Sequence, residues 1–153
     1  MKTKKRPVPP AVPAFWDTSA IVPLCCFQSQ TSDARKAARI YARQITWWAT
    51  SVEATSAFNR LFRERILSQA GKQQALARLD YLRHRWNEIQ PANEVRENAE
   101  RLLGVHRLRA ADALQLAAAL MWCNYHPSER PFIAGDEDLA AAAEAERFTV
   151  IRV

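Results

Sequence analysis

Short apolar runs that stand directly before helix-starting sequences most constrain the fold of this chain. AFW ends at residue 16, ITWWA spans residues 45–49 and PFIA spans residues 131–134. These runs are rich in β-branched and aromatic residues, and they lack the alternation of polar and apolar side chains typical of a half-exposed strand. Strands of this kind are buried on both faces, as in a parallel sheet covered by helices. The runs therefore predict an α/β fold.

Helical patterns separate these runs. Apolar residues in 51–68 recur at the i, i+3, i+4, i+7 spacing of one helix face. We expect helices over residues 18–27, 31–44, 51–68, 72–85, 93–103, 109–123 and 136–146, and strands over 14–16, 45–49, 86–89, 131–134 and 148–153. Gly71 is expected to separate two helices, and Gly104 to cap another. The predicted fold is a three-layer sandwich with a central, mostly parallel sheet of about five strands.

The basic charge of the chain is concentrated at its start. The net charge is +6, and four of these charges lie in the first six residues, so the remainder carries about +2. Residues 1–12 are basic and proline-rich, and we expect a flexible arm there, followed by one domain over residues 13–153. Only three glycines occur, which excludes the P-loop and the Rossmann phosphate loop.

The cysteines and the hydropathy pattern indicate a cytoplasmic protein. Cys25, Cys26 and Cys123 lie in apolar runs and lack the CxxC spacing of a metal site. We expect them to be reduced core residues. No apolar stretch reaches membrane-spanning length, so no association with a membrane is expected.

Four acidic residues stand at the starts of predicted helices. Asp17 and Asp136 follow predicted strands, Glu53 lies near the start of the helix after the second strand, and Asp112 lies near the start of an apolar helix. Because ligands bind beyond the carboxyl ends of parallel strands, we expect these four side chains to meet at one edge of the sheet.

Each of these acids also has a purely structural explanation. Asp17 and Asp136 suit helix N-caps, and Glu53 with Thr50 fits the T-x-x-E capping box. Asp112 is the only charged residue between Ala110 and Cys123, and burial of an unpaired carboxylate costs several kcal/mol. It needs a cation, which is either the Arg109 guanidinium or a bound metal ion.

Four carboxylates in one place would repel one another unless they held hard cations. Oxygen ligands of this kind select Mg²⁺ or Mn²⁺. Such a site usually performs phosphoryl chemistry, in which the metal lowers the pKa of a bound water and stabilises charge on the phosphate. The sequence therefore predicts a metal-dependent hydrolase.

Four motifs in a fixed order resemble the PIN-domain family, and within it the VapC-like toxins of type II toxin–antitoxin systems. They are WDTSAIVPL, SVEATSAF, LRAADALQLAAAL and IAGDEDLAAAAEAERFTVI, and the resemblance covers residues 14–153. It implies a magnesium-dependent endoribonuclease in which Asp17 and Asp112 are the principal metal ligands. Glu53 and Asp136 would complete the metal or water shell, with Asp138 as an outer member and Thr18 or Ser19 in contact with the site.

The resemblance also implies partners, and it leaves alternatives open. A toxin of this kind cuts RNA, pairs with a small antitoxin whose tail blocks the acidic pocket, and often forms a homodimer. The chain departs from the family pattern at Gln115, where many members place a histidine, and in its longer N-terminal arm. The alternatives are a non-catalytic PIN-like module that binds RNA or protein, and a magnesium phosphatase. A haloacid-dehalogenase-type phosphatase would need D-x-D after its first strand, where this chain has D-T-S.

Arginines are the candidate RNA-binding residues. Three lie on the predicted helix over 51–68 and three on or just after the next helix: Arg60, Arg63, Arg65, Arg78, Arg83 and Arg85. They would either line an approach to the acidic site or form a solvated helix face.

Overall fold

A five-stranded parallel sheet forms the centre of the molecule in the computed structural model, which describes residues 11–153. The strands are β1 (Pro13–Trp16), β2 (Arg43–Trp47), β3 (Asn87–Ile89), β4 (Pro131–Ala134) and β5 (Thr149–Arg152), in the order β3-β2-β1-β4-β5. Every neighbouring pair is parallel, which confirms the predicted sheet. The predicted arm lies outside the described residues except for Ala11 and Val12, and it stays a prediction.

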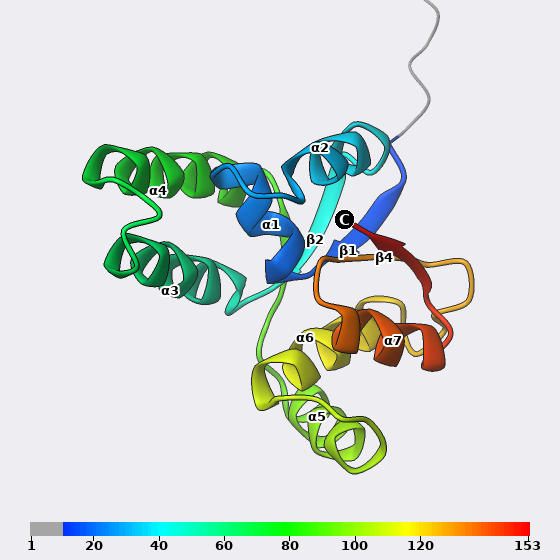
Figure 1. Ribbon diagram of the computed structural model, residues 1–153. Coiled ribbons are helices and arrows are strands. Elements are labelled where there is room, and N and C mark those ends of the chain that lie inside the picture. The colour runs from blue at the N-terminus through cyan, green and yellow to red at the C-terminus, as the bar shows by residue number, and fades with distance from the viewer. Residues whose placement is uncertain (1–10) are drawn as a thin grey trace, which may run out of the picture.

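Seven helices within the described residues cover the two faces of the sheet (Figure 1). One face carries α1 (Thr18–Cys25), α2 (Thr31–Ile40), α3 (Thr50–Arg63) and α4 (Gln69–Arg83). The other face carries α5 (Asn93–Val105), α6 (Ala110–Trp122) and α7 (Glu137–Ala145). The predicted three-layer sandwich is therefore confirmed.

Successive residues of the central strand β1 supply the two apolar cores. Ala14 and Trp16 pack with the α1–α4 layer, whereas Phe15 packs with the α5–α7 layer. The Phe15 ring stacks on that of Phe132 in β4, with 5.3 Å between the ring centroids. All three β1 side chains are fully buried, as the apolar run predicts for a central parallel strand.

The second helix is shorter than the sequence predicts. It ends at Ile40, and the backbone N–H of Tyr41 caps it by donating to the carbonyl of Ala37. The predicted extension to residue 44 is wrong because Arg43 and Gln44 begin β2 and pair with Pro13 and Ala14 of β1. Pairing with the central strand outweighs the helical propensity of these residues.

The expectations for two glycines are also wrong. The third helix ends at Arg63, and Ser68 begins the next helix by accepting a hydrogen bond from the N–H of Gly71 at 3.0 Å. Gly71 therefore lies inside α4 rather than between two helices. Gly104 lies inside α5, whose C-cap is His106.

Two further expectations concern the cysteines and the membrane. All three cysteines are free, with Cys123 buried and Cys25 and Cys26 half-buried, as expected for core thiols. Within residues 11–153, no helix combines the length and the apolar character needed to cross a membrane.

Two alanine substitutions at glycine positions test the packing of the fold. Gly104→Ala should raise the free energy of unfolding by about 0.5 kcal/mol, because the new methyl group meets no atom within 4 Å and alanine favours a helix. Gly135→Ala should lower it by about 1 kcal/mol, because its Cβ would lie 3.1 Å from the carbonyl oxygen of Ser19. Urea unfolding measures both values. An unchanged stability of Gly135→Ala would contradict the close approach of α1 to the β4–α7 turn.

Candidate active site

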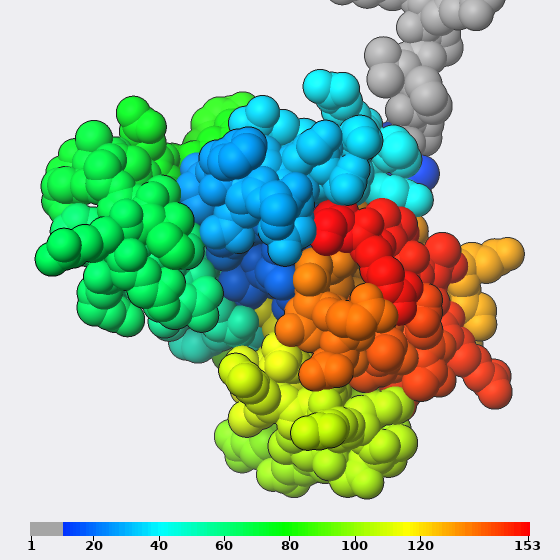
Figure 2. Space-filling view, in the orientation of Figure 1, coloured from blue at the N-terminus to red at the C-terminus, as the bar shows by residue number. Residues whose placement is uncertain are grey.

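The four predicted acids all lie at the start of a helix at the carboxyl-terminal edge of the sheet. Asp17 is the N-cap of α1 and Asp136 is the N-cap of α7, whereas Glu53 and Asp112 lie in the first turns of α3 and α6. In Figure 2 the starts of α1 (blue), α3 (teal), α6 (yellow) and α7 (orange) meet near the middle of the face. The partial positive charge of a helix N-terminus favours a carboxylate at each of these positions.

The Ser19 side chain joins the first and the last of these helix starts. Its hydroxyl donates to Asp17 Oδ2 and accepts hydrogen bonds from the backbone N–H groups of Gly135 at 2.8 Å and Asp136 at 3.1 Å. The Asp17 N–H also donates to the carbonyl of Ile133 at 3.0 Å. These bonds hold the β1–α1 and β4–α7 connections together, and with them Asp17 and Asp136.

Asp17 is the most deeply buried of the four carboxylates, with 3% of its surface exposed. It caps α1 by accepting from the Ser19 N–H at 2.9 Å, so its predicted capping role is real. Burial raises the pKa of the Asp17 carboxyl to about 7, against the lowering effect of the Ser19 hydrogen bonds. The charges of Glu53 and Asp112 raise it further. Asp17 therefore caps α1 and also lies close to the other acids.

Gln115 joins α6 to α1 and α3 from a fully buried position. Its Nε2 lies 2.7 Å from Thr18 Oγ1, 3.2 Å from Thr50 Oγ1 and 3.3 Å from Glu53 Oε2. The Thr18 hydroxyl in turn donates to Glu53 Oε2 at 3.0 Å. These contacts fix the Glu53 carboxylate at the edge of the site.

Glu53 is therefore held by side chains from other helices and not by a capping box. Thr50 is the first residue of α3, and its hydroxyl accepts from Gln115, so the predicted T-x-x-E cap is wrong. Burial raises the pKa of Glu53, the hydrogen bonds from Gln115 and Thr18 lower it, and the charge of Asp112 raises it.

Asp112 is electrostatically the centre of the group. It is half-buried, because its first-turn position leaves it nearer to solvent than the apolar helix around it suggests. Burial raises its pKa, as does the charge of Asp136 and, more weakly, that of Asp138; the Arg109 charge lowers it. Arg109 forms no ion pair with Asp112 within 4.0 Å, so the alternative of a simple Arg109–Asp112 pair is not supported.

The donor set suits a hard divalent cation. No Lys, Arg or His within residues 11–153 forms an ion pair with any of the four carboxylates, and the buried Oε1 of Gln115 has no hydrogen-bond partner there. Across the same residues, no three Asp, Glu, His or Cys side chains are already grouped to hold a metal ion. Mg²⁺ is commonly bound by one or two carboxylates together with water and substrate phosphates, which this arrangement allows.

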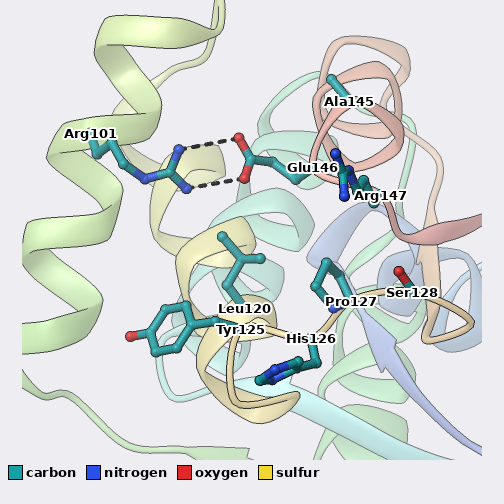
Figure 3. Close-up of a pocket in the computed structure, with 9 residues that line it drawn as sticks. All are labelled: Arg101, Leu120, Tyr125, His126, Pro127, Ser128, Ala145, Glu146 and Arg147. Carbon is teal, nitrogen blue, oxygen red and sulfur yellow. Dashed lines mark hydrogen bonds and ion pairs between the residues drawn. The ribbon is translucent and has the colours of Figure 1, made fainter.

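A separate hollow lies away from these carboxylates, at the C-terminal ends of α6 and α7. Its volume is about 440 Å³, and Arg101 of α5 crosses it to Glu146 with Nη2–Oε2 at 3.0 Å (Figure 3). His106 Nε2 lies 2.8 Å from the same glutamate. Burial would raise the pKa of Glu146, but the hydrogen bonds from Arg101 and His106 leave it lowered. The Glu146 carboxylate thus binds Arg101 and His106 and holds α5 against α7.

Sequence reasoning missed the contacts of Gln115 and the bonding partners of Ser19, although the resemblance placed Thr18 or Ser19 at the site. Gln115 is the only polar side chain between Ala113 and Trp122, three residues after Asp112, and this isolated amide could have marked a buried contact to the site. The hydrogen bonds of Ser19 had no comparable signal, because Gly135 and Asp136 are more than a hundred residues away in the chain.

Neutralising Asp17 should stabilise the metal-free protein. Its raised pKa means that the folded state binds the proton more tightly than the unfolded state between the ordinary value of 3.8 and about 7. Stability therefore falls as the pH rises through this window. Asp17→Asn should raise the free energy of unfolding by about 1–3 kcal/mol at pH 8 in EDTA, with the gain disappearing near pH 4. The exposed Asp33→Asn is the control in urea titrations, and equal behaviour of the two variants would contradict the burial of an Asp17 charge.

The comparisons with known proteins come from structure rather than sequence. No family model matches the sequence, and no curated protein matches it. Among solved structures, a toxin–antitoxin complex from Klebsiella pneumoniae is 19% identical, with a TM-score of 0.56 over 83% of this chain and 90% of that one.

Two further structures are similar. VapC20 from Mycobacterium tuberculosis, a toxin that cleaves the sarcin–ricin loop, is 20% identical, with a TM-score of 0.63 over 84% of this chain and 94% of that one. PAE2754 from Pyrobaculum aerophilum is 19% identical, with a TM-score of 0.59 over 93% and 90%. The chain therefore has the PIN-like α/β fold of VapC toxins, as its motifs predict.

Proposed function

We propose that this protein is a metal-dependent endoribonuclease that hydrolyses RNA phosphodiester bonds. The observation that carries the proposal is the group formed by Asp17, Glu53, Asp112 and Asp136 at one edge of the sheet. The charge of Asp112 raises the pKa of Asp17 and of Glu53, and the charge of Asp136 raises the pKa of Asp112. No cationic side chain of the described residues forms an ion pair with these carboxylates. A fold maintains such a cluster at a cost in stability, which a bound cation would offset.

Asp17 and Asp112 are the carboxylates that we propose to hold the metal ion, with Mg²⁺ or Mn²⁺ as the ion that suits oxygen ligands. The ion would supply a more acidic bound water and stabilise negative charge on the scissile phosphate. Glu53, fixed by Gln115 and Thr18, would orient that water and take up its proton, for which a raised pKa is suitable. Asp136, held by Ser19, would complete the shell.

The similar structures support a place in a toxin–antitoxin pair. One is a toxin–antitoxin complex, and another is a toxin that cleaves a ribosomal RNA loop. We propose that this chain likewise acts on RNA in the cytoplasm, that a small antitoxin inhibits it by covering the acidic edge, and that it forms a homodimer. The alternative, a non-catalytic PIN-like module that binds RNA or protein, is favoured by the absence of a preformed three-ligand group within residues 11–153.

The substitution Asp112→Asn distinguishes the metal-dependent ribonuclease from the non-catalytic binding module. Outer hydrogen-bond partners of a metal ligand contribute about 10–100-fold to activity, so loss of a direct ligand should cost more than about a hundredfold. Cleavage of labelled hairpin and single-stranded RNAs is measured with Mg²⁺, with Mn²⁺ and with EDTA, and circular dichroism checks the fold. The exposed Asp33→Asn is the control.

Titration of Mn²⁺ followed by calorimetry gives an independent readout on the same proteins. The wild type and Asp33→Asn should bind the ion, and Asp112→Asn should not. Full RNA cleavage by Asp112→Asn, or equal cleavage in EDTA, would contradict the proposed metal-dependent mechanism. RNA binding without any cleavage by the wild type would favour the non-catalytic module.

Gln115→Leu should lower kcat by about 10–100-fold and leave the fold intact, because it removes the amide that holds Glu53 while roughly keeping the volume of the side chain. The pH dependence of the rate should also shift to higher pH, since loss of the hydrogen bonds that lower the pKa of Glu53 raises that pKa further. Rate–pH profiles of the wild type and the variant measure both effects. A reduced kcat with an unshifted profile would indicate that Gln115 does not act through Glu53.

A further inference from the structure

A second concave site lies at the C-terminal end of α1, the helix that Asp17 caps at its N-terminus. Its volume is about 620 Å³, and four of the residues around it are arginines: Arg35, Arg39, Arg78 and Arg85. No aspartate or glutamate of residues 11–153 lines it. All four arginines are exposed, and none forms an ion pair with a carboxylate of residues 11–153. We call these four side chains and the hollow between them the arginine pocket.

The topology fixes the position of the arginine pocket. It lies between the C-terminal parts of α1, α2 and α4, next to Gln44 at the start of β2, and Figure 1 shows α4 and α2 on either side of α1. Asp17 caps the other end of α1, whose eight residues span about 12 Å. Arg78 and Arg85 therefore lie about the length of α1 away from Asp17 and do not border it.

Two of the guanidinium groups are held in place by one aromatic ring. The Tyr81 ring centroid lies 3.7 Å from the Cζ atom of Arg85 and 4.8 Å from that of Arg78. Arg85 Nη1 also donates to the carbonyl of Tyr81 at 3.2 Å. Stacking of a guanidinium on a ring restricts its motion and leaves N–H groups at its edge free to donate. A planar, partly ordered fork of this kind suits the oxygens of a phosphate group.

The thiol that lines the arginine pocket is not reactive at neutral pH. The Cys25 thiol lines it, but burial raises the pKa of that thiol to about 12, against a smaller lowering effect of Arg78. Cys25 is therefore protonated and is neither a nucleophile nor a metal ligand at neutral pH. The pocket therefore offers a ligand the positive charge of its arginines and the uncharged amides of Gln44 and Gln74.

We infer that the arginine pocket is a second RNA-binding site, which holds phosphate groups of the strand that is cut at the carboxylate edge. The inference rests on the proposed function for the identity of the polyanion. The carboxylate edge repels RNA, so attraction must come from another part of the surface. A single strand of several nucleotides is long enough to span the length of α1, which separates the pocket from Asp17.

The test compares two pairs of arginines that change the net charge equally. Arg39→Gln with Arg78→Gln alters the arginine pocket, and Arg130→Gln with Arg147→Gln alters two exposed, ion-pair-free arginines beside β4 and α7. Binding of a labelled oligouridine of about 12 nucleotides is followed by fluorescence anisotropy between about 50 and 200 mM salt. The full chain is used in EDTA, so that RNA is not cut, and circular dichroism checks the fold.

The expected result is a loss of affinity and of salt dependence in the pocket variant only. Affinity should fall about tenfold or more, and the slope of log K against log salt should become shallower by about 1.4, since each phosphate contact to a single strand contributes about 0.7. The control pair should keep a slope close to that of the wild type. Equal losses in the two pairs, or no loss in the pocket pair, would overturn the inference.

Competition experiments on the wild type identify the source of the bound anion. If RNA is the ligand, unlabelled oligouridine should compete far better than uridine monophosphate or polyglutamate of equal charge. Uridine monophosphate that competes as well as the strand would instead assign the pocket to a free nucleotide, and equal or better competition by polyglutamate would assign it to an acidic protein segment. Either outcome overturns the RNA assignment.

The binding and cleavage experiments distinguish a failure of the arginine-pocket inference from a failure of the proposed nuclease function. If the wild type cuts RNA with Mg²⁺ but the pocket variant binds oligouridine normally, the arginine pocket is not an RNA site and the proposed function stands. If RNA binding depends on the pocket but no divalent ion supports cleavage, the inference stands and the proposed nuclease function fails.

Discussion

Mutual repulsion among four carboxylates is the constraint on which the rest of this structure depends. Each acid is desolvated or lies beside another acid, and no arginine or lysine of residues 11–153 forms an ion pair with any of them. The fold offsets part of this cost with backbone geometry. All four acids stand at the N-terminus of a helix, where unpaired N–H groups and the helix dipole favour negative charge. A parallel sheet provides several such N-termini at one edge, which an antiparallel hairpin does not.

Two uncharged polar side chains, the half-buried Ser19 and the buried Gln115, turn this arrangement of helices into a defined site. Ser19 bonds both to Asp17 and to the backbone beside Asp136, so it sets the separation of the two capping acids. Gln115 binds Glu53 directly and through Thr18, and therefore couples α6 to α1 and α3. Neither residue carries charge, so both orient the carboxylates without neutralising them. The carboxylates stay available for a cation, and a neutral amide and hydroxyl are the side chains that allow this.

The fold could be predicted from the sequence because its signals are local. The run PFIA is a buried strand with the predicted bounds, and the four acids follow from strand ends and helix starts. What failed depended on pairing or on distant contacts. Arg43 and Gln44 extend a helical pattern, yet pairing with β1 makes them a strand. Thr50 has the spacing of a capping box, but Gln115, sixty-five positions along the chain, takes its hydroxyl. The similar structures confirm the fold, whereas the role of each carboxylate still depends on the experiments above.

Parallel connectivity also explains why opposite charges lie at opposite ends of the sheet. A helix that follows a parallel strand begins at the carboxyl edge and runs back, so its N-terminus and C-terminus are separated by the length of the sheet. Acids suit the first end of a helix and arginines the second. α2 follows α1 and not a strand, and Arg39 in its last turn likewise lies at a helix C-terminus beside the arginine pocket. An enzyme that repels its polyanionic substrate at the reacting edge needs attraction nearby but not within that edge, where a guanidinium would pair with the carboxylates and displace the cation. Asp17 at the N-terminus of α1 and the arginines of α2 and α4 beside its C-terminus meet both requirements, because the length of α1 separates them.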